Sequence, residues 1–500
     1  MLRSGASTLL ESTVCRMMEQ FQIYRNAARL NWNASAAGPG ATQNHAGNGI
    51  ICTEKFGHNK KGTTEMTQLE SARAGIITKA MEKVAECENI NAETVRAAVA
   101  CGEAVIPLNI NHKNAKPTGV GRMFTTKINA NLGRSVTHSG KGDELEKLKV
   151  AMDAGADFVM DLSVGPDDLA AIRRGMLDAS DRPLGTVPVY ETISRTDGEI
   201  PQMNPAFLID VIRAQAEQGV DFMTLHAGLL LKHIPAAMKR RMGIVSRGGA
   251  IMAEWMMQNK SENPLYTRWD EVMDILAKYD VTVSLGDGMR PGCLADASDE
   301  AQFGELDVLG ELVERCRAHG VQVMVEGPGH VPFNQIQANM EREQEVCKKA
   351  PFYVLGPVVT DIAPGYDHIV SAIGATAAAT YGASLLCYVT PAEHLGLPDA
   401  DEVHQGCIAY KIAAHAGDVA RGLPGARRRD DEMADARATF DWDRQFAACL
   451  DPARARARWI KTRAFTDEAH DDDHCSMCGK QFCAVRTSRR IRKLADELKA

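Results

Sequence analysis

The residues best suited to redox chemistry are three cysteines near the end of the chain, Cys475, Cys478 and Cys483. Their C-x-x-C-x-x-x-x-C spacing lets two or three thiolates bind one metal centre, and Gly479 eases the turn between them. Structural zinc sites usually close with four Cys or His ligands. A cubane iron–sulfur cluster with three cysteines instead leaves one iron open. The spacing therefore leaves two hypotheses: a zinc site that borrows His474 or Cys449, and an open cluster.

Two histidines, His330 and His394, are candidate ligands for a second metal. Each follows a short segment at the end of a predicted strand, so the two imidazoles can converge. With water or substrate in the remaining positions they would hold Zn²⁺ or Fe²⁺. A histidine near an active site is more often an acid, a base or a hydrogen-bonding group, and that alternative stays open.

Carboxylates and a glycine-rich turn add further chemistry. The carboxylates are Asp161, Asp287, Glu326 and Asp361, which are candidate acids or bases, or ligands for a cationic substrate. For any one of them alone, a loop cap or a solvated carboxylate is the competing interpretation. The segment Ser246-Arg247-Gly248-Gly249 offers backbone N–H groups and a planar cation, which suits a phosphate or a carboxylate. An ordinary solvent-exposed turn is the alternative.

Eight short apolar runs must position these groups, and each reads as a buried parallel strand. They are 127–130, 157–162, 187–192, 222–226, 281–286, 322–327, 352–356 and 384–389. Amphipathic helices separate most of them, and four junctions repeat a glycine directly before a strand, at Gly155, Gly219, Gly320 and Gly382. This repeated alternation of strands and helices predicts an α/β fold of the (β/α)₈ TIM-barrel type. A doubly wound sheet is the alternative, but no G-x-G-x-x-G turn supports it.

Polar or titratable residues follow nearly every predicted strand. Barrel enzymes place their chemistry at the carboxyl ends of strands, so these residues predict a polar active-site mouth. The segment 105–112, which precedes the first of these strands, is interpreted as a lid or entrance.

Composition narrows the class of protein. The chain has 500 residues, a net charge of −8 and 13 cysteines, and its hydrophobic content of 45% is ordinary for a globular protein. The acidic balance argues against a general nucleic-acid binder, and no apolar run approaches the roughly 20 residues needed to span a bilayer. An odd number of scattered cysteines predicts a reducing, cytoplasmic location. Residues 1–65 lack a signal peptide and are interpreted as poorly ordered or non-native, with Met66 a candidate start.

Long strings around these residues closely resemble the phosphomethylpyrimidine synthase family, non-standard radical S-adenosylmethionine enzymes of thiamine biosynthesis. The strings are 161–163, 224–228, 246–249, 284–292, 325–332, 353–365, 388–398 and 475–483. The resemblance extends from about Met66 to Arg486. Residues 1–65 do not look like the N-terminal region of the family, and the segment 457–473 is less similar than its surroundings.

The resemblance implies a reaction and its cofactors. The reaction converts 5-aminoimidazole ribotide into 4-amino-5-hydroxymethyl-2-methylpyrimidine phosphate, releases formate and carbon monoxide, and makes the enzyme a carbon–carbon lyase. The implied cofactors are a [4Fe-4S] cluster, S-adenosyl-L-methionine and one mononuclear divalent metal, Zn or Fe. The implied partners are a second copy of the chain in a homodimer and an electron donor such as flavodoxin or ferredoxin.

The resemblance also assigns residues. His330 and His394 match the metal ligands, and Cys475, Cys478 and Cys483 match the cluster ligands. The substrate contacts fall on Asn131, Met160, Tyr190, His226, Ser246, Arg247, Gly248, Asp287, Gly288, Met289, Arg290, Glu326 and Tyr353.

The expected domains are a 66–120 helical and extended domain, a 121–400 catalytic barrel, C-terminal helices at 401–470 and a cluster tail at 471–500. Two other functions remain as alternatives. One is a zinc-dependent barrel hydrolase or lyase with a structural zinc knuckle in the tail. The other is a non-enzymatic zinc-knuckle tail that binds nucleic acid or protein. Its basic residues would be Arg454, Arg456, Arg458, Arg489 and Arg490, and the net charge disfavours it.

Overall fold

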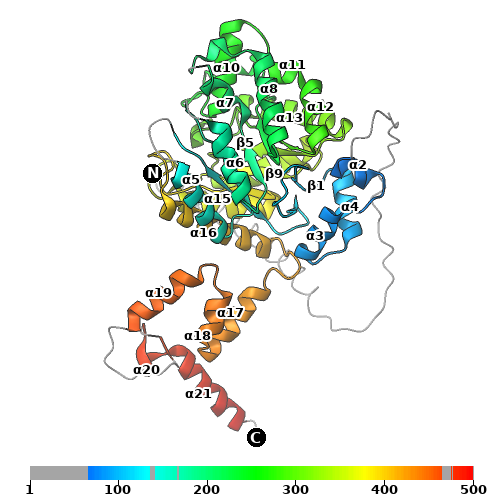
Figure 1. The fold of residues 1–500 in the computed structure, drawn as a ribbon. Coiled ribbons are helices and arrows are strands. Elements are labelled where there is room, and N and C mark those ends of the chain that lie inside the picture. Colours follow the sequence, from blue (N-terminus) through cyan, green and yellow to red (C-terminus); the bar gives the residue numbers. More distant parts are fainter. Residues whose placement is uncertain are drawn as a thin grey trace, which may run out of the picture. The chain divides into compact units, whose positions relative to one another are not determined.

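Eight parallel strands close into a barrel, as predicted (Figure 1). The computed structural model describes residues 66–135, 141–165, 168–196, 198–463, 474–475 and 477–498, so the expectations for residues 1–65 and for Asp471–Asp473 lie outside it. The barrel strands are β3 (Lys127–Leu132), β4 (Phe158–Asp161), β5 (Leu184–Thr186), β6 (Phe222–Leu225), β7 (Thr282–Leu285), β8 (Val323–Gly327), β9 (Phe352–Leu355) and β10 (Leu385–Cys387). Each strand pairs with the next in the chain, and β10 pairs with β3 to complete the (β/α)₈ barrel.

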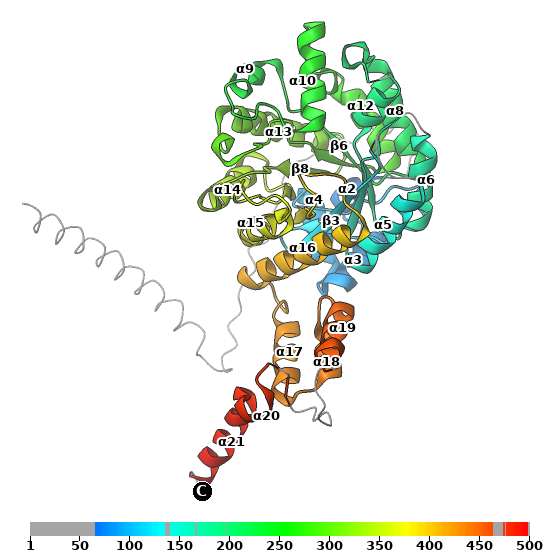
Figure 2. The same cartoon turned by 90° about the vertical axis from the view of Figure 1, so that its left-hand side faces the viewer.

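Helices surround the strands on the outside of the barrel (Figure 2). They are α5 (Lys141–Asp153), α6 (Leu169–Ala179), α7 (Pro188–Ser194), α8 (Pro205–Gln218), α9 (Ile234–Ala237), α10 (Arg247–Asn259), α11 (Pro264–Thr267), α12 (Trp269–Tyr279), α13 (Glu300–Ala318), α14 (Ile336–Val346), α15 (Asp367–Tyr381) and α16 (Ala400–Ala420). Short 3₁₀ turns lie at η1 (Ile200–Gln202), η2 (Leu231–His233), η3 (Leu294–Asp296) and η4 (Phe333–Gln335). One continuous cluster of buried apolar side chains joins the strands to these helices.

The glycines before the strands have a left-handed backbone. The φ angles of Gly155, Gly219, Gly320 and Gly382 are +91°, +113°, +73° and +139°. A residue with a Cβ is strained at such angles, so these positions end each helix and turn the chain directly into the next strand.

The predicted third strand is wrong. Residues 187–192 do not form a strand: Val187 is extended, and Pro188 begins helix α7. The strand is the preceding Leu184–Thr186, which pairs with β4 and β6. Proline has no N–H to give to a sheet, while its fixed φ suits the first turn of a helix. The alternation of Val187 and Val189 around Pro188 therefore marks a strand-to-helix junction.

The N-terminal part packs at the opposite end of the barrel from the carboxyl ends of the strands. It contains α2 (Gln68–Arg73), α3 (Lys79–Glu88), α4 (Ala92–Cys101) and the antiparallel pair β1 (Ala104–Val105) and β2 (Val120–Gly121), with a small apolar core of its own. The Asn109 N–H donates to Asp221 Oδ1 (2.8 Å), and the Ile106 N–H donates to Gln322 Oε1 (2.7 Å). Asp221 and Gln322 directly precede β6 and β8. The interpretation of residues 105–112 as a lid or entrance to the mouth is therefore wrong.

The C-terminal part is helical, with α17 (Arg428–Thr439), α18 (Trp442–Ala448), α19 (Pro452–Arg463), α20 (Gly479–Phe482) and α21 (Ala484–Glu497). The Phe446 ring lies 5.6 Å from that of Trp459, which packs α18 against α19. The Arg489 guanidinium on α21 lies over the Phe440 ring (4.9 Å). Across the described residues, every helix is too short or too polar to cross a bilayer.

Candidate active site at the mouth of the barrel

A cavity opens at the carboxyl ends of the barrel strands, and each of the eight strands or the loop directly after it contributes to its wall. The lining residues are Asn131, Met160, Leu162, Val187, Tyr190, Thr224, His226, Asp287, Arg290, Glu326, Gly327, Tyr353, Leu355 and Cys387. Eight of the substrate contacts assigned from the sequence are among them. Barrel enzymes place their chemistry at this end, so the polar mouth predicted from the strand ends is present.

The remaining assigned contacts flank the cavity. Ser246, Arg247 and Gly248 form the beginning of helix α10, where Ser246 Oγ accepts a hydrogen bond from the Gly249 N–H (3.2 Å). The predicted glycine-rich turn is therefore the first turn of a 13-residue helix. Unpaired N–H groups and the helix dipole make such a terminus a ready site for an anion.

Two close contacts tie the beginning of α10 to the cavity wall. The Arg247 guanidinium lies over the Tyr190 ring (4.9 Å). A Cβ added to Gly248 would lie 2.3 Å from His226 Cε1, so only glycine allows the helix to approach that imidazole. Gly288 and Met289 follow Asp287 in the loop after β7, and the Met289 side chain is buried in the core.

His226 is a neutral imidazole. Burial, with a smaller contribution from the neighbouring Arg290, lowers its pKa to about 3. Its Nε2 lies 3.1 Å from Ser246 Oγ, while its buried Nδ1 has no partner within the described structure. The ring can therefore give or take a hydrogen bond at Nδ1 without adding charge to the cavity.

Two buried carboxyl groups and one cation set the charge of the cavity. Arg290 is the only Lys or Arg among the lining residues, and its Nη1 lies 3.2 Å from Asp287 Oδ1. Burial raises the pKa of Asp287 to about 7, with Arg290 opposing it. Burial also raises the pKa of Glu326, whose Oε1 accepts hydrogen bonds from Thr224 Oγ1 (2.6 Å) and Ser284 Oγ (2.7 Å). Carboxyl groups with raised pKa values are suited to proton transfer near neutral pH.

Asp287→Asn is expected to make the stability of the fold less dependent on pH. Because the folded-state pKa of about 7 lies above the ordinary value, this carboxyl contributes stability at acid pH that is lost as the pH rises through 7. The change in unfolding free energy that the substitution causes should therefore be about 2 kcal/mol more favourable at pH 8 than at pH 5. Denaturant unfolding at both pH values measures it. A change that does not become more favourable as the pH rises would contradict the raised pKa.

Neutral polar groups line the opposite wall. Asn129 Nδ2 donates to Asn131 Oδ1 (2.8 Å) and to Tyr353 Oη (2.7 Å). Asn131 Nδ2 in turn donates to Cys387 Sγ (3.0 Å). This network orients the amide of Asn131 toward the cavity. The assignment from the sequence missed Thr224, which lines the cavity, and the supporting residues Ser284 and Asn129, which hold Glu326 and Tyr353. Their role depends on partners from other strands.

His330 and His394 come together as predicted, with ring centroids 5.2 Å apart. Each Nδ1 is taken by a carboxylate: His330 by Asp361 (2.8 Å) and His394 by Asp367 (3.1 Å). Burial lowers the pKa of His330 against the opposing effect of Asp361, which favours the neutral ring that binds metals. A carboxylate on Nδ1 leaves Nε2 for a metal and fixes the direction of the ring. The donor set therefore fits a metal that takes its other ligands from water or substrate.

Asp161 is a loop cap. Its Oδ1 accepts from the Ser163 N–H (3.0 Å), and it does not line the cavity. The competing interpretation given for each single carboxylate is correct here.

The three tail cysteines are suitable ligands for a cluster, but their thiols do not lie together at one point. Cys475 and Cys478 are exposed, whereas Cys483 is buried. Gly479 has the expected positive φ of +62°. In the described part of the chain, no three His, Cys, Asp or Glu side chains are grouped to hold a metal ion. Three thiols within nine residues suit a cluster as donors, so cluster binding would have to draw the three side chains together.

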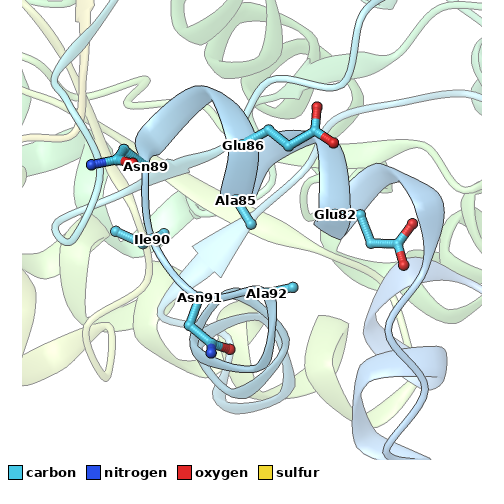
Figure 3. A pocket seen from close by; sticks show the side chains of 7 residues that line it. All are labelled: Glu82, Ala85, Glu86, Asn89, Ile90, Asn91 and Ala92. Carbon is cyan, nitrogen blue, oxygen red and sulfur yellow. The ribbon is translucent and has the colours of Figure 1, made fainter.

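A second hollow lies between α3 and α4 and is remote in sequence from the barrel strands (Figure 3). Its walls come from Glu82, Ala85, Glu86, Asn89, Ile90, Asn91 and Ala92. Two carboxylates and no cation among these residues make it unsuited to an anionic substrate.

Comparison with known proteins identifies relatives over most of the chain. The sequence model of the Radical SAM ThiC family matches residues 67–490. Phosphomethylpyrimidine synthases from two strains of Halobacterium salinarum are each 57% identical over 431 residues, which cover 86% of this chain and 90% of the relative. The enzyme of that name from Natronomonas pharaonis is 57% identical over 430 residues, with the same coverage. A solved dihydropteroate synthase from Xanthomonas albilineans matches with a TM-score of 0.37 at 13% identity over 64% of this chain and 100% of that one, a likeness too weak to bear on function.

Proposed function

Because the chain belongs to the radical SAM ThiC family, we propose that it converts 5-aminoimidazole ribotide into 4-amino-5-hydroxymethyl-2-methylpyrimidine phosphate in thiamine biosynthesis, with release of formate and carbon monoxide. This makes it a carbon–carbon lyase. The observation that carries the proposal is the cavity at the barrel mouth, which gathers eight of the assigned substrate contacts. Its relatives bear the name of this activity.

The phosphate of the ribotide binds at the beginning of α10. Ser246, Arg247 and Gly248 offer backbone N–H groups and a guanidinium there, beside Tyr190 and His226 of the cavity. A helix N-terminus and a planar cation together suit a phosphate. Because His226 is neutral, it adds a hydrogen bond to the phosphate without adding a positive charge.

The aminoimidazole ring binds deeper in the cavity, between Asp287, Glu326 and the Asn131–Tyr353 wall. Glu326 is fixed by two hydroxyl donors, so its free oxygen has a defined direction. Asp287, with a pKa of about 7, can exchange a proton with the ring or its amino group near neutral pH. Gly288, Met289 and Arg290 complete this side of the site.

Cys475, Cys478 and Cys483 would hold the [4Fe-4S] cluster, with S-adenosylmethionine at the open iron. When bound, the cluster supplies the electron for reductive cleavage of S-adenosylmethionine to methionine and a 5′-deoxyadenosyl radical. The cavity residues hold the ribotide in one orientation against that radical and exclude water. Membership of a radical SAM family supports this cluster over the alternative zinc knuckle.

His330 and His394 would hold the mononuclear metal, Zn or Fe, through their Nε2 atoms. The metal would help to anchor the methionyl end of S-adenosylmethionine or the methionine product. We also propose a cytoplasmic homodimer that receives electrons from a flavodoxin or a ferredoxin, without nucleic-acid or membrane partners.

Asp361→Asn is expected to weaken metal binding. The substitution keeps the size of the side chain but removes the charge that pairs with His330 Nδ1, so the direction and basicity of the ring are less well fixed. Zinc or iron affinity should fall about 10-fold or more. Metal analysis after dialysis against graded chelator measures it, with Asp270→Asn on the exposed surface as the control. Equal affinities in the two variants would argue against a metal on the histidine pair.

Anaerobic turnover tests the function directly. Reconstituted protein should convert 5-aminoimidazole ribotide only with S-adenosylmethionine and a reductant, and should form 5′-deoxyadenosine together with the pyrimidine phosphate. Activity in air without S-adenosylmethionine would instead support the zinc hydrolase or lyase.

A further inference from the structure

The loop after β7 carries Asp287 and Arg290 into the cavity, yet side chains outside the cavity hold its backbone. The Met289 N–H donates to Glu305 Oε2 at 2.7 Å. On the other side of the same peptide segment, Arg240 Nη2 donates to the Met289 carbonyl oxygen at 2.8 Å. A single residue between the two site residues is thus held at both its N–H and its carbonyl group.

Both holding side chains are shielded from water. Glu305 lies on α13 and is 2% exposed, and the Arg240 side chain is likewise 2% exposed. Arg240 is fixed in turn by Asp299, which accepts from its Nε (2.7 Å) and Nη2 (2.6 Å). Buried hydrogen bonds of this kind are costly to break, because the freed group finds no water.

The approach of Glu305 to the loop requires glycine at neighbouring positions. A Cβ added to Gly288 would lie 3.0 Å from Glu305 Oε1, and one added to Gly228 would lie 3.3 Å from Glu305 Cγ. A Cβ added to Gly249 would lie 2.4 Å from the Gly288 carbonyl oxygen. Glu305 therefore reaches the point where the loops after β6 and β7 meet the first turn of α10, and all three carry assigned substrate contacts.

The charge state of Glu305 suits this place. Burial, with a smaller contribution from the nearby Asp287, raises its pKa to about 8. At neutral pH the group is largely protonated, so it accepts the Met289 hydrogen bond without placing a second negative charge beside Asp287.

We propose that Glu305 is a positioning residue for substrate binding. By holding the Met289 N–H, it sets the loop so that Asp287 and Arg290 face the cavity before the substrate arrives, with Arg240 holding the same residue from the other side. The inference rests on the proposed function, because the substrate used to test it is the ribotide.

Glu305→Leu removes the acceptor and leaves the Met289 N–H buried without a partner. The dissociation constant for 5-aminoimidazole ribotide, measured by anaerobic calorimetry on the full chain without reductant, should rise about 10-fold or more, since an unsatisfied buried donor is costly. Glu305→Gln keeps an acceptor and should restore binding to within about 3-fold of the wild type. Arg240→Met leaves the Met289 carbonyl without its donor and should also raise the dissociation constant for the ribotide. This variant replaces Glu305→Leu in the test if the leucine variant does not fold.

Glu343→Leu is the matched control. Glu343 is a fully buried residue on α14 whose carboxyl group has no hydrogen-bond partner in the described structure. The charges that act on its pKa are Arg317 and Arg122, not residues of the cavity. Its loss should leave ribotide binding unchanged.

Hydrogen–deuterium exchange of residues 286–291 separates this inference from the function itself. The segment should exchange about 10-fold faster in Glu305→Leu than in the wild type or in Glu343→Leu. Unchanged exchange, or wild-type ribotide affinity in both Glu305→Leu and Arg240→Met, would overturn the positioning role. A wild-type chain that does not bind the ribotide would overturn the proposed substrate, while exchange would still decide whether Glu305 holds the loop.

Discussion

Replacing Cys478 with alanine should abolish cluster assembly and lower product formation by about three orders of magnitude or more, because the electron for the reaction must pass through the bound cluster. The thiol is exposed and stands in the middle of the trio, three residues from Cys475. Its loss leaves two thiolates, too few to hold a cubane. The barrel does not depend on the tail thiol, so the variant should keep the far-ultraviolet dichroism of the wild type.

Iron and sulfide analysis after anaerobic reconstitution measures this effect. The wild type should carry about four irons per chain. Cys87→Ala is the control, because Cys87 is also an exposed cysteine but lies on helix α3, outside the tail. If Cys478→Ala keeps the iron and the turnover of the wild type, the assignment of the cluster ligands is wrong. A wild type that carries only zinc would favour the zinc-knuckle alternative.

Replacing Arg290 with methionine should lower kcat/KM for the ribotide about 100-fold or more, since truncating one member of a buried charged pair is strongly unfavourable. Arg290 is the only Lys or Arg on the cavity wall, and it faces Asp287 at 3.2 Å. Without it, the cavity holds two carboxyl groups and no cation among its lining residues, which is a poor place for an anionic substrate. Arg290→Lys should recover only part of the activity, because lysine cannot reproduce the planar fork.

The pH profile provides a second measurement for the same variant. Arg290 holds down the pKa values of Asp287 and Glu326 against the effect of burial. Removing the guanidinium should therefore move any activity that needs ionised Asp287 to higher pH. Arg268→Met is the control, because Arg268 makes a surface ion pair with Glu271 and should leave kcat/KM unchanged. An unchanged KM and pH profile in Arg290→Met would show that Arg290 does not contact the substrate.

Local sequence patterns were sufficient for most of the barrel. Short apolar runs, amphipathic helices and glycines such as Gly155 and Gly219 depend mainly on neighbouring residues, and they recovered seven of the eight strands. The third strand was misplaced because Val187-Pro188-Val189 is compatible with both a strand and a helix start, and only pairing with β4 selects Leu184–Thr186. The segment 105–112 was assigned to the wrong end of the barrel for a similar reason: its partners, Asp221 and Gln322, are more than 100 residues away.

The sequence by itself determined which residues are available for chemistry: a cysteine trio that no fourth cysteine follows, two histidines after strand ends, and polar groups at nearly every strand end. These follow from residue type and spacing, which the chain displays directly. Only the tertiary structure decided their states and partners. It buries His226 so that its pKa falls to about 3, raises that of Asp287 to about 7, fixes Glu326 with hydroxyls from two other strands, and pairs each histidine with a carboxylate. Desolvation and hydrogen bonding depend on what surrounds a group in space, and distant parts of the chain supply those surroundings.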